Sequence, residues 1–397
     1  MHVTAALTTR PQPEAAAEEL LRQLGPAGEN RRAVLLYATV QYDLAGLCRH
    51  LAEGLAGGVV LAGCSTQGVV GPGAASETGF IAGAMAFHGD EVRAAAAVAE
   101  DLASDTAAKA GALATGLRAG LGRDPRLVVP LYDPLAGADV GLLIERLRTG
   151  LPGSVLIGAA ASQPWGPMVE TFQFHGGRVL TRAAVALGLD GDFEVTTAQS
   201  SGAVPTGFEM KVTRAEGNRL LELDGQPALQ VWLEVVGAAS STDVNDTAAW
   251  AIGVRRGEGP AGDDGDPEHW SILTAFAFDP EQQAVILPIA VPPGTLVMFH
   301  HRTVEAVYQR ALEMAGRVVA RLEGRAPLAV LGFECGGRAS PFLGAELTRQ
   351  ENLAMQAALA PGAPWLGMLA WGEIADRVEG TSFCNYTYPL AVLTAPR

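Results

Sequence analysis

Several short stretches of this chain carry side chains that could bind or activate a small molecule. The clearest is Cys64-Ser65-Thr66-Gln67, which follows an apolar run and lies between Gly63 and Gly68. Backbone N–H groups in such a turn can lower the pKa of a thiol and make it a nucleophile, given a base from elsewhere in the fold. The hydroxyl and amide groups beside it can orient a polar ligand. A small buried cysteine followed by ordinary turn residues explains the same pattern.

Two charged residues near the C-terminus form a second candidate site. Arg338 follows Gly336-Gly337 at the end of an apolar run, where a planar guanidinium could hold a carboxylate through two hydrogen bonds. Glu373 ends a comparable run and could bind a ligand amine, or act as an acid or base if it is desolvated. Together they would suit the two charged ends of an amino acid. The alternative is that Arg338 forms an ion pair with Glu334 or with Glu373.

Other polar or sulfur-containing residues fall at comparable strand ends. They are Tyr132, Asp133, Ser162 and Cys335. Tyr132 and Asp133 could cap a turn or line a pocket, and Cys335 fits a packed core better than a ligand contact. Ser162 precedes Pro164-Trp165, which fits either a lid or an ordinary surface loop. All four residues join the candidate ligand contacts, with Cys64 and Glu373 as the candidates for catalysis.

The elements that must position these residues repeat along the chain. Three segments share one order: an apolar strand, a polar turn, a helix, and a second apolar strand that ends in small polar residues. They begin at Ala33, Leu127 and Leu328. A strand–helix–strand crossover makes the two strands parallel, so we expect their carboxyl ends, and the candidate residues there, to gather. A further strand or hairpin follows each unit, which predicts mixed sheets.

The pattern predicts a mixed α/β protein of two domains, with mixed sheets built from repeated strand–helix–strand units flanked by helices. We expect an N-terminal helical extension at 1–30, a first domain at 31–200 and a second at 201–397. Between the second and third units, we predict a strand at Trp270–Phe278. The stretch Gly257–Pro267 is rich in Gly, Asp and Pro, which is typical of a solvated loop.

Composition excludes several kinds of partner. The formal charge of −15 disfavours binding to the phosphate backbone of a nucleic acid or to an anionic lipid surface. Neither Lys109 nor Lys211 follows a glycine, so there is no P-loop. The four cysteines lack zinc-site spacing, and no apolar run is long enough for a membrane span. We therefore expect a cytoplasmic protein with reduced thiols, no metal site, no nucleic-acid partner and no membrane insertion.

Several stretches of the sequence resemble the FIST family, the paired FIST N and FIST C domains of prokaryotic sensory proteins. The resemblance lies in Gly63–Gly68, Val212–Ala215 with Gly217-Asn218, Leu223–Ala228, Gly332–Cys335 with Arg338, and Trp371–Ile374. Their order and spacing over roughly residues 31–394 carry the resemblance. It implies a module that binds small molecules such as amino acids and that is often joined to kinase, cyclase or chemoreceptor signalling parts.

This resemblance predicts a sensory protein that binds a small polar ligand, such as an amino acid or a related metabolite. Because the chain ends at Arg397 without an appended signalling region, we expect it to signal to a separate protein. In one departure from the family pattern, Leu273 stands where relatives often place an arginine.

Three alternatives stay open at this point. The first is an enzyme that uses Cys64 or Glu373 on a small amine or carboxylate substrate. The second follows from the resemblance, because a subset of the family are haem-containing nitric oxide sensors. No cofactor is predicted, and the histidines that could bind a haem iron are His2, His50, His88, His175, His269, His300 and His301. The third is a structural partner module that binds no small molecule.

Overall fold

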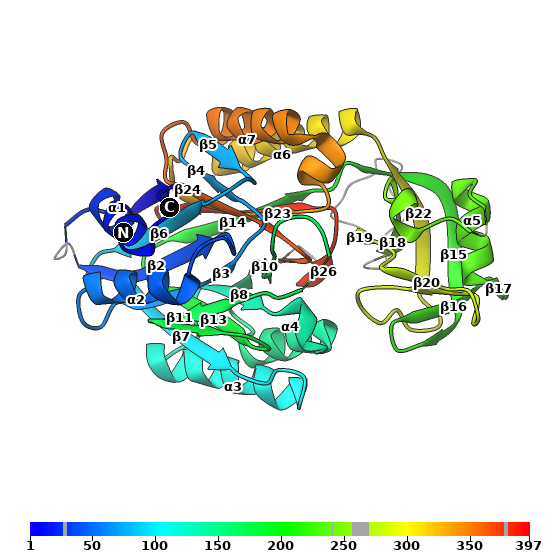
Figure 1. The fold of residues 1–397 in the computed structure, drawn as a ribbon, viewed down its shortest axis with the longest axis horizontal. Coiled ribbons are helices and arrows are strands. Elements are labelled where there is room, and N and C mark those ends of the chain that lie inside the picture. The colour runs from blue at the N-terminus through cyan, green and yellow to red at the C-terminus, as the bar shows by residue number, and fades with distance from the viewer. Residues whose placement is uncertain (27–29, 168, 240, 256–269, 377–379) are drawn as a thin grey trace.

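The computed structural model describes residues 1–397 except 27–29, 168, 240, 256–269 and 377–379. A main body holds three sheets that share one strand order, and a fourth sheet stands to one side of it (Figure 1). The main-body sheets mix parallel and antiparallel neighbours. The predicted mixed α/β class is therefore confirmed.

The first main-body sheet comes from one repeat of the chain, ordered strand, helix, strand, helix, strand, strand. Strands β2 and β3 run parallel across the α2 crossover, β6 returns antiparallel to β2, and β1 pairs antiparallel with β6. The bounds are β1 His2–Thr8, α1 Pro13–Gln23, β2 Arg31–Ala38, α2 Leu44–Gly54, β3 Val60–Ser65 and β6 Ala82–His88. The N-terminal segment thus contributes an edge strand as well as the helix predicted there.

The second and third repeats have the same order. The second consists of β7 Arg93–Ala99, α3 Thr106–Leu121, β8 Leu127–Tyr132, α4 Val140–Gly150, β10 Gly158–Ala160 and β13 Ala184–Asp190, with β9 Val155–Leu156 beside β8. The third consists of β14 Glu194–Ser200, α6 Val304–Leu322, β23 Pro327–Cys335, α7 Ala345–Leu359, β24 Trp365–Ala370 and β27 Tyr388–Thr394. The sequence analysis located the parallel pair of each repeat but not its leading strand.

A two-stranded arm leaves each repeat after its second parallel strand and extends the sheet of another repeat. Strands β4 Val69–Gly71 and β5 Ala74–Ser76 extend the third sheet through β24. Strands β11 Gln173–His175 and β12 Arg178–Leu180 extend the first through β3. Strands β25 Glu373–Ala375 and β26 Ser382–Cys384 extend the second through β10. The exchange is cyclic, so each sheet is completed by another repeat.

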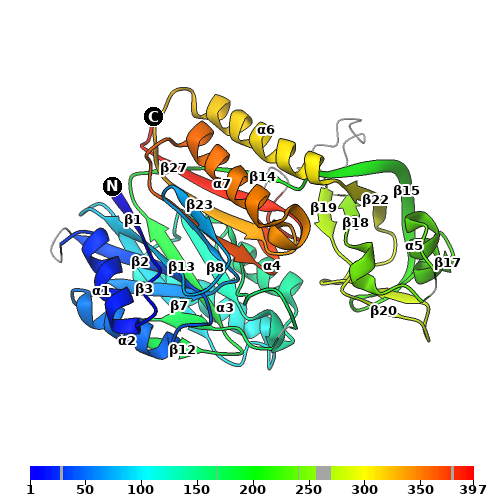
Figure 2. The same cartoon turned by 45° about the horizontal axis from the view of Figure 1, so that its top comes forward.

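Helix pairs cover the outer faces of the three sheets, and the inner faces meet in one core. The pairs are α1 with α2, α3 with α4, and α6 with α7. Leu35, Leu187 and Leu331, one from each sheet, belong to the same buried cluster. Figure 2 shows α6 and α7 lying over β23 and β27. Because the strands are covered on both faces, their sequences are almost continuously apolar.

An insertion between β14 and α6 forms the fourth sheet, in the order β19-β18-β22-β15-β16-β21-β20. Its elements are β15 Ala203–Glu216, β16 Arg219–Leu223, β17 Gln226–Pro227, α5 Ala228–Val236, β18 Trp250–Arg255, β19 Trp270–Leu273, β20 Ala277–Asp279, β21 Ala284–Ile286 and β22 Leu296–Arg302. The prediction of one strand over Trp270–Phe278 is wrong. The chain leaves the sheet at Thr274, which donates to the Tyr386 hydroxyl at 2.7 Å, and β20 then pairs with β21 instead. The predicted loop Gly257–Pro267 lies outside the described residues.

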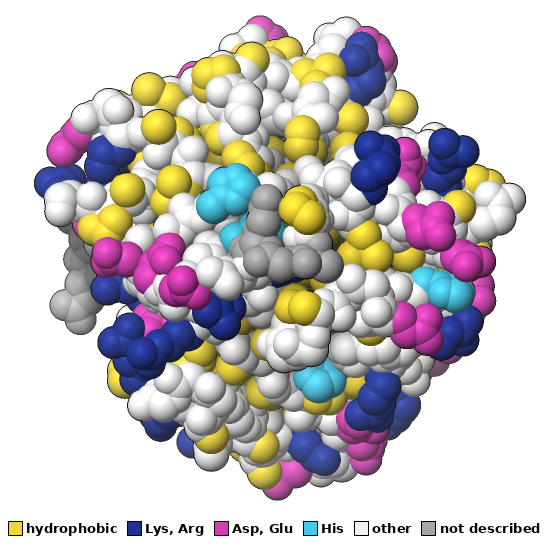
Figure 3. Space-filling view, turned by 90° about the vertical axis from the view of Figure 1, so that its left-hand side faces the viewer, with side chains coloured by type: hydrophobic (Ala, Val, Ile, Leu, Met, Phe, Trp, Pro, Cys, Tyr) yellow, Lys and Arg dark blue, Asp and Glu magenta, His cyan; other side chains and the backbone are white. Residues whose placement is uncertain are grey.

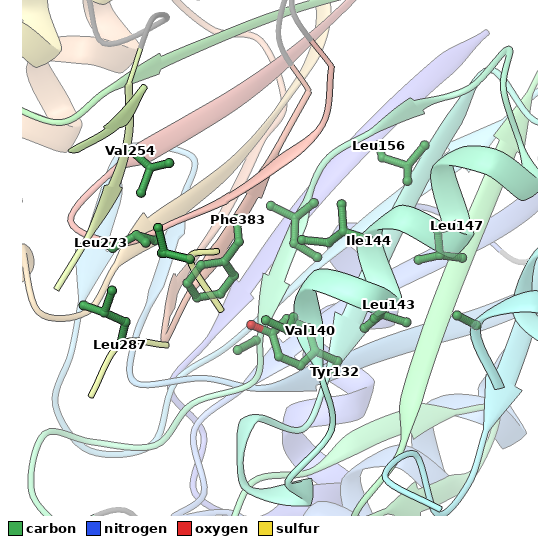
Figure 4. Close-up of a cluster of buried hydrophobic side chains, with 14 of the residues drawn as sticks. Tyr132, Val140, Leu143, Ile144, Leu147, Leu156, Val254, Leu273, Leu287 and Phe383 are labelled. Carbon is green, nitrogen blue, oxygen red and sulfur yellow. The ribbon is translucent and has the colours of Figure 1, made fainter. Parts of the chain in front are cut away.

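The insertion shares a buried cluster with the main body. Leu273 and Leu287 of the insertion, Phe383 of β26 and Ile144 of α4 all belong to it. Figure 4 shows Phe383 between the insertion side chains and those of α4. The insertion is therefore packed against the second and third repeats.

The surface far from the insertion carries charges of both signs. Figure 3 shows this face, where acidic and basic side chains are interspersed among apolar ones. The excess of acidic residues therefore forms no single-signed field on this face. Within the described part of the chain, no helix has both the length and the apolar composition needed to cross a membrane.

Candidate functional site

The second parallel strands of the three repeats end close together, as their crossovers predict. Ser65 Oγ donates to Ser162 O at 2.9 Å, and Gln67 N donates to Ser162 Oγ at 2.8 Å. Thr66 Oγ1 donates to Leu369 O at 2.9 Å, and Ser162 Oγ donates to the same carbonyl. We refer to Ser65, Thr66, Gln67 and Ser162 as the strand-end cluster. All four are buried, and their bonds join the ends of β3, β10 and β24.

Gln67 connects the strand-end cluster to a nearby cavity. Its Nε2 donates to Glu77 Oε2 at 3.0 Å and to Gly336 O at 3.2 Å, and its Oε1 accepts from Trp371 Nε1 at 3.3 Å. Glu77 also accepts from Ser340 N at 3.1 Å and from the Ser340 hydroxyl. Gln67 is thus bonded through its side chain to the side chain of Glu77, which lines this cavity, and Thr66 and Ser162 bond the carbonyl of Leu369, another lining residue.

The cavity has a volume of about 370 Å³ and lies between the arm of the first repeat and α7 of the third. It is lined by Val70, Ala75, Ser76, Glu77, Thr78, Ser340, Ala345, Glu346, Thr348, Arg349 and Leu369. Arg349 Nη2 bonds Glu346 Oε1 at 2.8 Å and its Nε bonds Oε2 at 3.1 Å, and these side chains are 47% and 64% exposed. Solvent screens this exposed pair, so a ligand carboxylate could compete with Glu346 for Arg349. The volume falls in the usual range of small-molecule sites.

Glu373 is fully buried next to the strand-end cluster. Its carboxyl accepts from Gly372 N at 3.1 Å, Thr387 N at 3.2 Å and Thr387 Oγ1 at 2.9 Å. Burial raises the pKa of Glu373 to about 8, although these hydrogen bonds oppose the shift. The carboxyl is therefore mostly protonated at neutral pH. Tyr132 and Cys335 both lie near enough for the Glu373 charge to raise their pKa values.

The two cysteine candidates have the environment of packed thiols. Cys64 lies within β3, is buried, and has its Sγ 3.8 Å from Met368 Sδ. Burial raises the pKa of Cys64 and also that of Cys335. The lowered thiol pKa that the turn hypothesis requires is not found, because the residue is part of a covered strand rather than of a solvated turn.

Asp133 has the turn-capping role that was one of its two predicted roles. Its carboxylate accepts from Leu135 N at 2.8 Å, Thr171 Oγ1 at 2.7 Å and Arg182 N at 2.7 Å. Tyr132 precedes it and is buried in the core on the α4 side of the second sheet. These bonds fix the segment before β11 and the turn between β12 and β13 to the end of β8.

Arg338 is held by two buried carboxylates. Its Nη1 bonds Glu334 Oε1 at 2.7 Å and Glu351 Oε2 at 2.7 Å, and its Nη2 bonds Glu351 Oε1 at 2.6 Å. The predicted ion pair with Glu334 is present, but the second carboxylate is that of Glu351, not of Glu373. A ligand carboxylate would have to displace one of these bonds, and the clamp role of Arg338 stays a prediction.

Arg302 and Glu77 were missed by the sequence analysis. Arg302 ends β22, is 1% exposed, and its guanidinium carbon lies 3.4 Å from the ring centre of Tyr386 and 4.0 Å from that of Phe342. Its Nη2 donates to Ala248 O, whereas its Nε and Nη1 have no partner in the structure as described. The sequence signal that could have identified Arg302 is an arginine at the end of a strand, directly before the helix cap Thr303.

The described histidines do not identify a haem ligand. His300 is buried with Nδ1 3.0 Å from Met298 O, and burial lowers its pKa to about 4. His301 packs against Trp250, and His88 Nε2 lies 3.1 Å from Thr4 Oγ1. Over the described ranges, no group of three or more His, Cys, Asp or Glu is arranged to hold a metal ion.

Known proteins match this chain along most of its length. The FIST N domain matches residues 32–226, and the FIST C domain matches residues 228–376. The uncharacterized protein MT0897 of Mycobacterium tuberculosis is 30% identical over 285 residues, 71% of each chain. The uncharacterized protein Rv0628c of the same species is 28% identical over 406 residues, 99% of each chain.

Among solved structures, the cyanuric acid hydrolase from A. caulinodans aligns with 99% of each chain at 10% identity. Its TM-score of 0.35 is too low to support an argument. The two domain matches, by contrast, together span nearly all of the sequence. The protein therefore belongs to the FIST family, whose domains are small-ligand sensor domains.

Proposed function

We propose that this protein is a cytoplasmic sensor that binds a small zwitterion, such as an amino acid or a related metabolite, in the cavity between β5 and α7. The observation that carries the proposal is a cavity of about 370 Å³ with the carboxylate of Glu77 and the guanidinium of Arg349 on its walls. Charges of opposite sign on the cavity lining suit a ligand with an ammonium group at one end and a carboxylate at the other.

The hydrogen-bond inventory of Glu77 supports this assignment. A carboxylate offers about four acceptor positions. The Ser340 hydroxyl and Gln67 Nε2 bond Oε2, and Ser340 N bonds Oε1. Oε1 thus keeps an acceptor position for a ligand ammonium, while Arg349 can exchange its exposed partner Glu346 for a ligand carboxylate.

The same contacts offer a route from ligand to output. Glu77 holds Gln67, and Gln67 bonds Ser162 and Gly336 at the junction of the repeats. A ligand that binds one arrangement of this junction better than another would shift the population toward it. Within this proposal, a separate signalling protein reads the shift.

A thermal-shift screen of the standard amino acids tests the proposal, followed by calorimetry on any hit. We expect a hit to bind at least tenfold more weakly to E77Q and to R349A. The matched control is R317A, because Arg317 is an exposed arginine on α6 outside the cavity lining.

Two results would change the assignment. A hit that binds E77Q and R349A as tightly as the wild type would place the ligand elsewhere. Turnover of the bound compound, lost in E373Q, would instead support the enzyme alternative, with the buried carboxyl of Glu373 as the acid or base.

A further inference from the structure

The buried guanidinium of Arg302 lies outside the cavity, where the insertion meets the main body. Arg302 of β22 is sandwiched between the rings of Tyr386 and Phe342, both from the third repeat. It is 1% exposed, and its Nε and Nη1 find no acceptor among the residues described. Buried N–H groups of a charged side chain nearly always donate a hydrogen bond, so the lack of an acceptor for these two groups among the described residues needs an explanation.

Among the residues that the structure describes, no carboxylate compensates the charge of Arg302. The described groups whose charges act on it are Tyr386, Cys335 and Arg338, none of which is a carboxylate. Arg338 adds positive charge, but its own two carboxylates compensate it. A cation removed from water without an anion is costly, so this position favours an anionic ligand.

The surroundings of Arg302 are contributed by both sides of the junction. Ala251, Trp270 and Met298 of the insertion form one buried cluster with Cys335 and Tyr386 of the main body. Asn385 N donates to Ile272 O at 2.7 Å, which fastens the turn before β27 to β19. The site is thus bounded by ordered, buried residues.

The backbone of Tyr386 is held in a strained conformation at this junction. Its φ is +56°, in the left-handed region that non-glycine residues rarely adopt. The ring lies over the Arg302 guanidinium, and its hydroxyl accepts from Thr274 Oγ1 at 2.7 Å. Strain of this kind persists where the surrounding structure requires it, often at ligand sites.

We propose that Arg302 binds the carboxylate of a small organic acid, at a second ligand site independent of the Glu77 cavity. The carboxylate oxygens accept from the unbonded Nε–H and Nη1–H groups, and the two flanking rings orient the planar guanidinium. Because Arg302 belongs to the insertion and both rings belong to the third repeat, bound carboxylate fastens the insertion to the main body.

Titration of the full-length protein with sodium acetate tests this site, with acetamide and sodium chloride as parallel arms at constant ionic strength. We expect acetate to raise the melting temperature saturably, with acetamide and chloride giving no such rise. The acetate affinity should fall at least tenfold in R302M. It should be unchanged in R317A, the exposed control arginine of α6. Loss of the response in R349A would instead place the acetate in the Glu77 cavity, so the failure of one site is distinguished from the failure of the other.

A second measurement covers the case in which R302M does not fold. In ¹⁵N-arginine-labelled wild-type protein, the Arg302 Nε–H resonance, identified by its absence from R302K, should shift with acetate. An acetate response that is equal in R302M, that is lost in R349A, or that chloride reproduces would overturn the proposal. So would an Arg302 resonance that does not move.

Discussion

The two most deeply buried arginines in the described part of the chain have opposite surroundings. Arg338 and Arg302 are both at most 1% exposed, and each lies over a tyrosine ring, at 5.4 Å from Tyr388 and 3.4 Å from Tyr386. Arg338 has two carboxylate partners, whereas the one acceptor described for Arg302 is a backbone carbonyl. Burial alone therefore does not separate a structural arginine from a binding one. The separation comes from whether the protein supplies the counter-charge.

The largest effect is expected from R338M. It leaves Glu334 and Glu351 buried without their cation, so we expect the free energy of unfolding to fall by about 3–5 kcal/mol. Urea denaturation measures this loss. The double variant R338M/E351Q should recover part of it, because one uncompensated carboxylate is removed. A loss below about 1 kcal/mol would remove the contrast between the two arginines.

The next largest effect is expected from E373Q, which replaces the buried carboxyl of Glu373 by an amide. The pKa of Glu373 in the folded protein, about 8, lies above its ordinary value. At pH values between these two pKa values, the folded state therefore binds more protons than the unfolded state. Its contribution to stability is therefore fully present below the unfolded pKa and is lost as pH rises through 8. In E373Q the free energy of unfolding should fall less steeply with pH, by up to about 1.4 kcal/mol per pH unit between pH 5 and 7. Denaturation of both proteins at several pH values measures this difference, and equal slopes would show that Glu373 keeps an ordinary pKa.

R302M should change stability far less than R338M. The variant loses two stacking contacts of the guanidinium but also removes an uncompensated charge, so we expect a net change within about 1 kcal/mol of zero. The same urea measurements apply, in buffer free of carboxylates. A loss as large as that of R338M would assign Arg302 a structural role.

The smallest effect is expected from R349A, in which an exposed arginine is removed. Its pair with Glu346 is screened by solvent, so the expected change in stability is at most about 0.5 kcal/mol. Thermal melts of the free protein check this value. A larger loss would mean that Arg349 stabilises α7, and R349A would then be a poor test of the ligand cavity.

The fold elements that local sequence determines were predictable. The helix at Leu44–Gly54 is capped by Asp43, and the helix at Val304–Leu322 is capped by Thr303, as their sequences indicate. The parallel strand pairs follow from the same local patterns. The cyclic exchange of arms does not, because it pairs residues as distant as Val70 and Gly367. No local sequence pattern indicates a pairing partner that is so distant in the chain.

The candidate site was predictable to the extent that strand ends determine it. Gln67 and Ser162 meet because parallel crossovers bring their strand ends to one place. Arg302 was not predictable, since its importance lies in the absence of a counter-charge, which only the folded arrangement shows. One of the two partners of Arg338 was predictable. Glu334 is near Arg338 in sequence, whereas Glu351 lies on the following helix.

The exchange of arms also has a consequence for synthesis on the ribosome. The arm at residues 69–76 finds its partner β24 only after residue 370 has been made, and β10 waits for the arm at residues 373–384. At bacterial or eukaryotic elongation rates, the first arm remains without its partner for roughly 15–60 s. During that interval the nascent chain exposes unpaired strand edges, so we expect the yield of folded protein to depend on translation speed and on chaperone access.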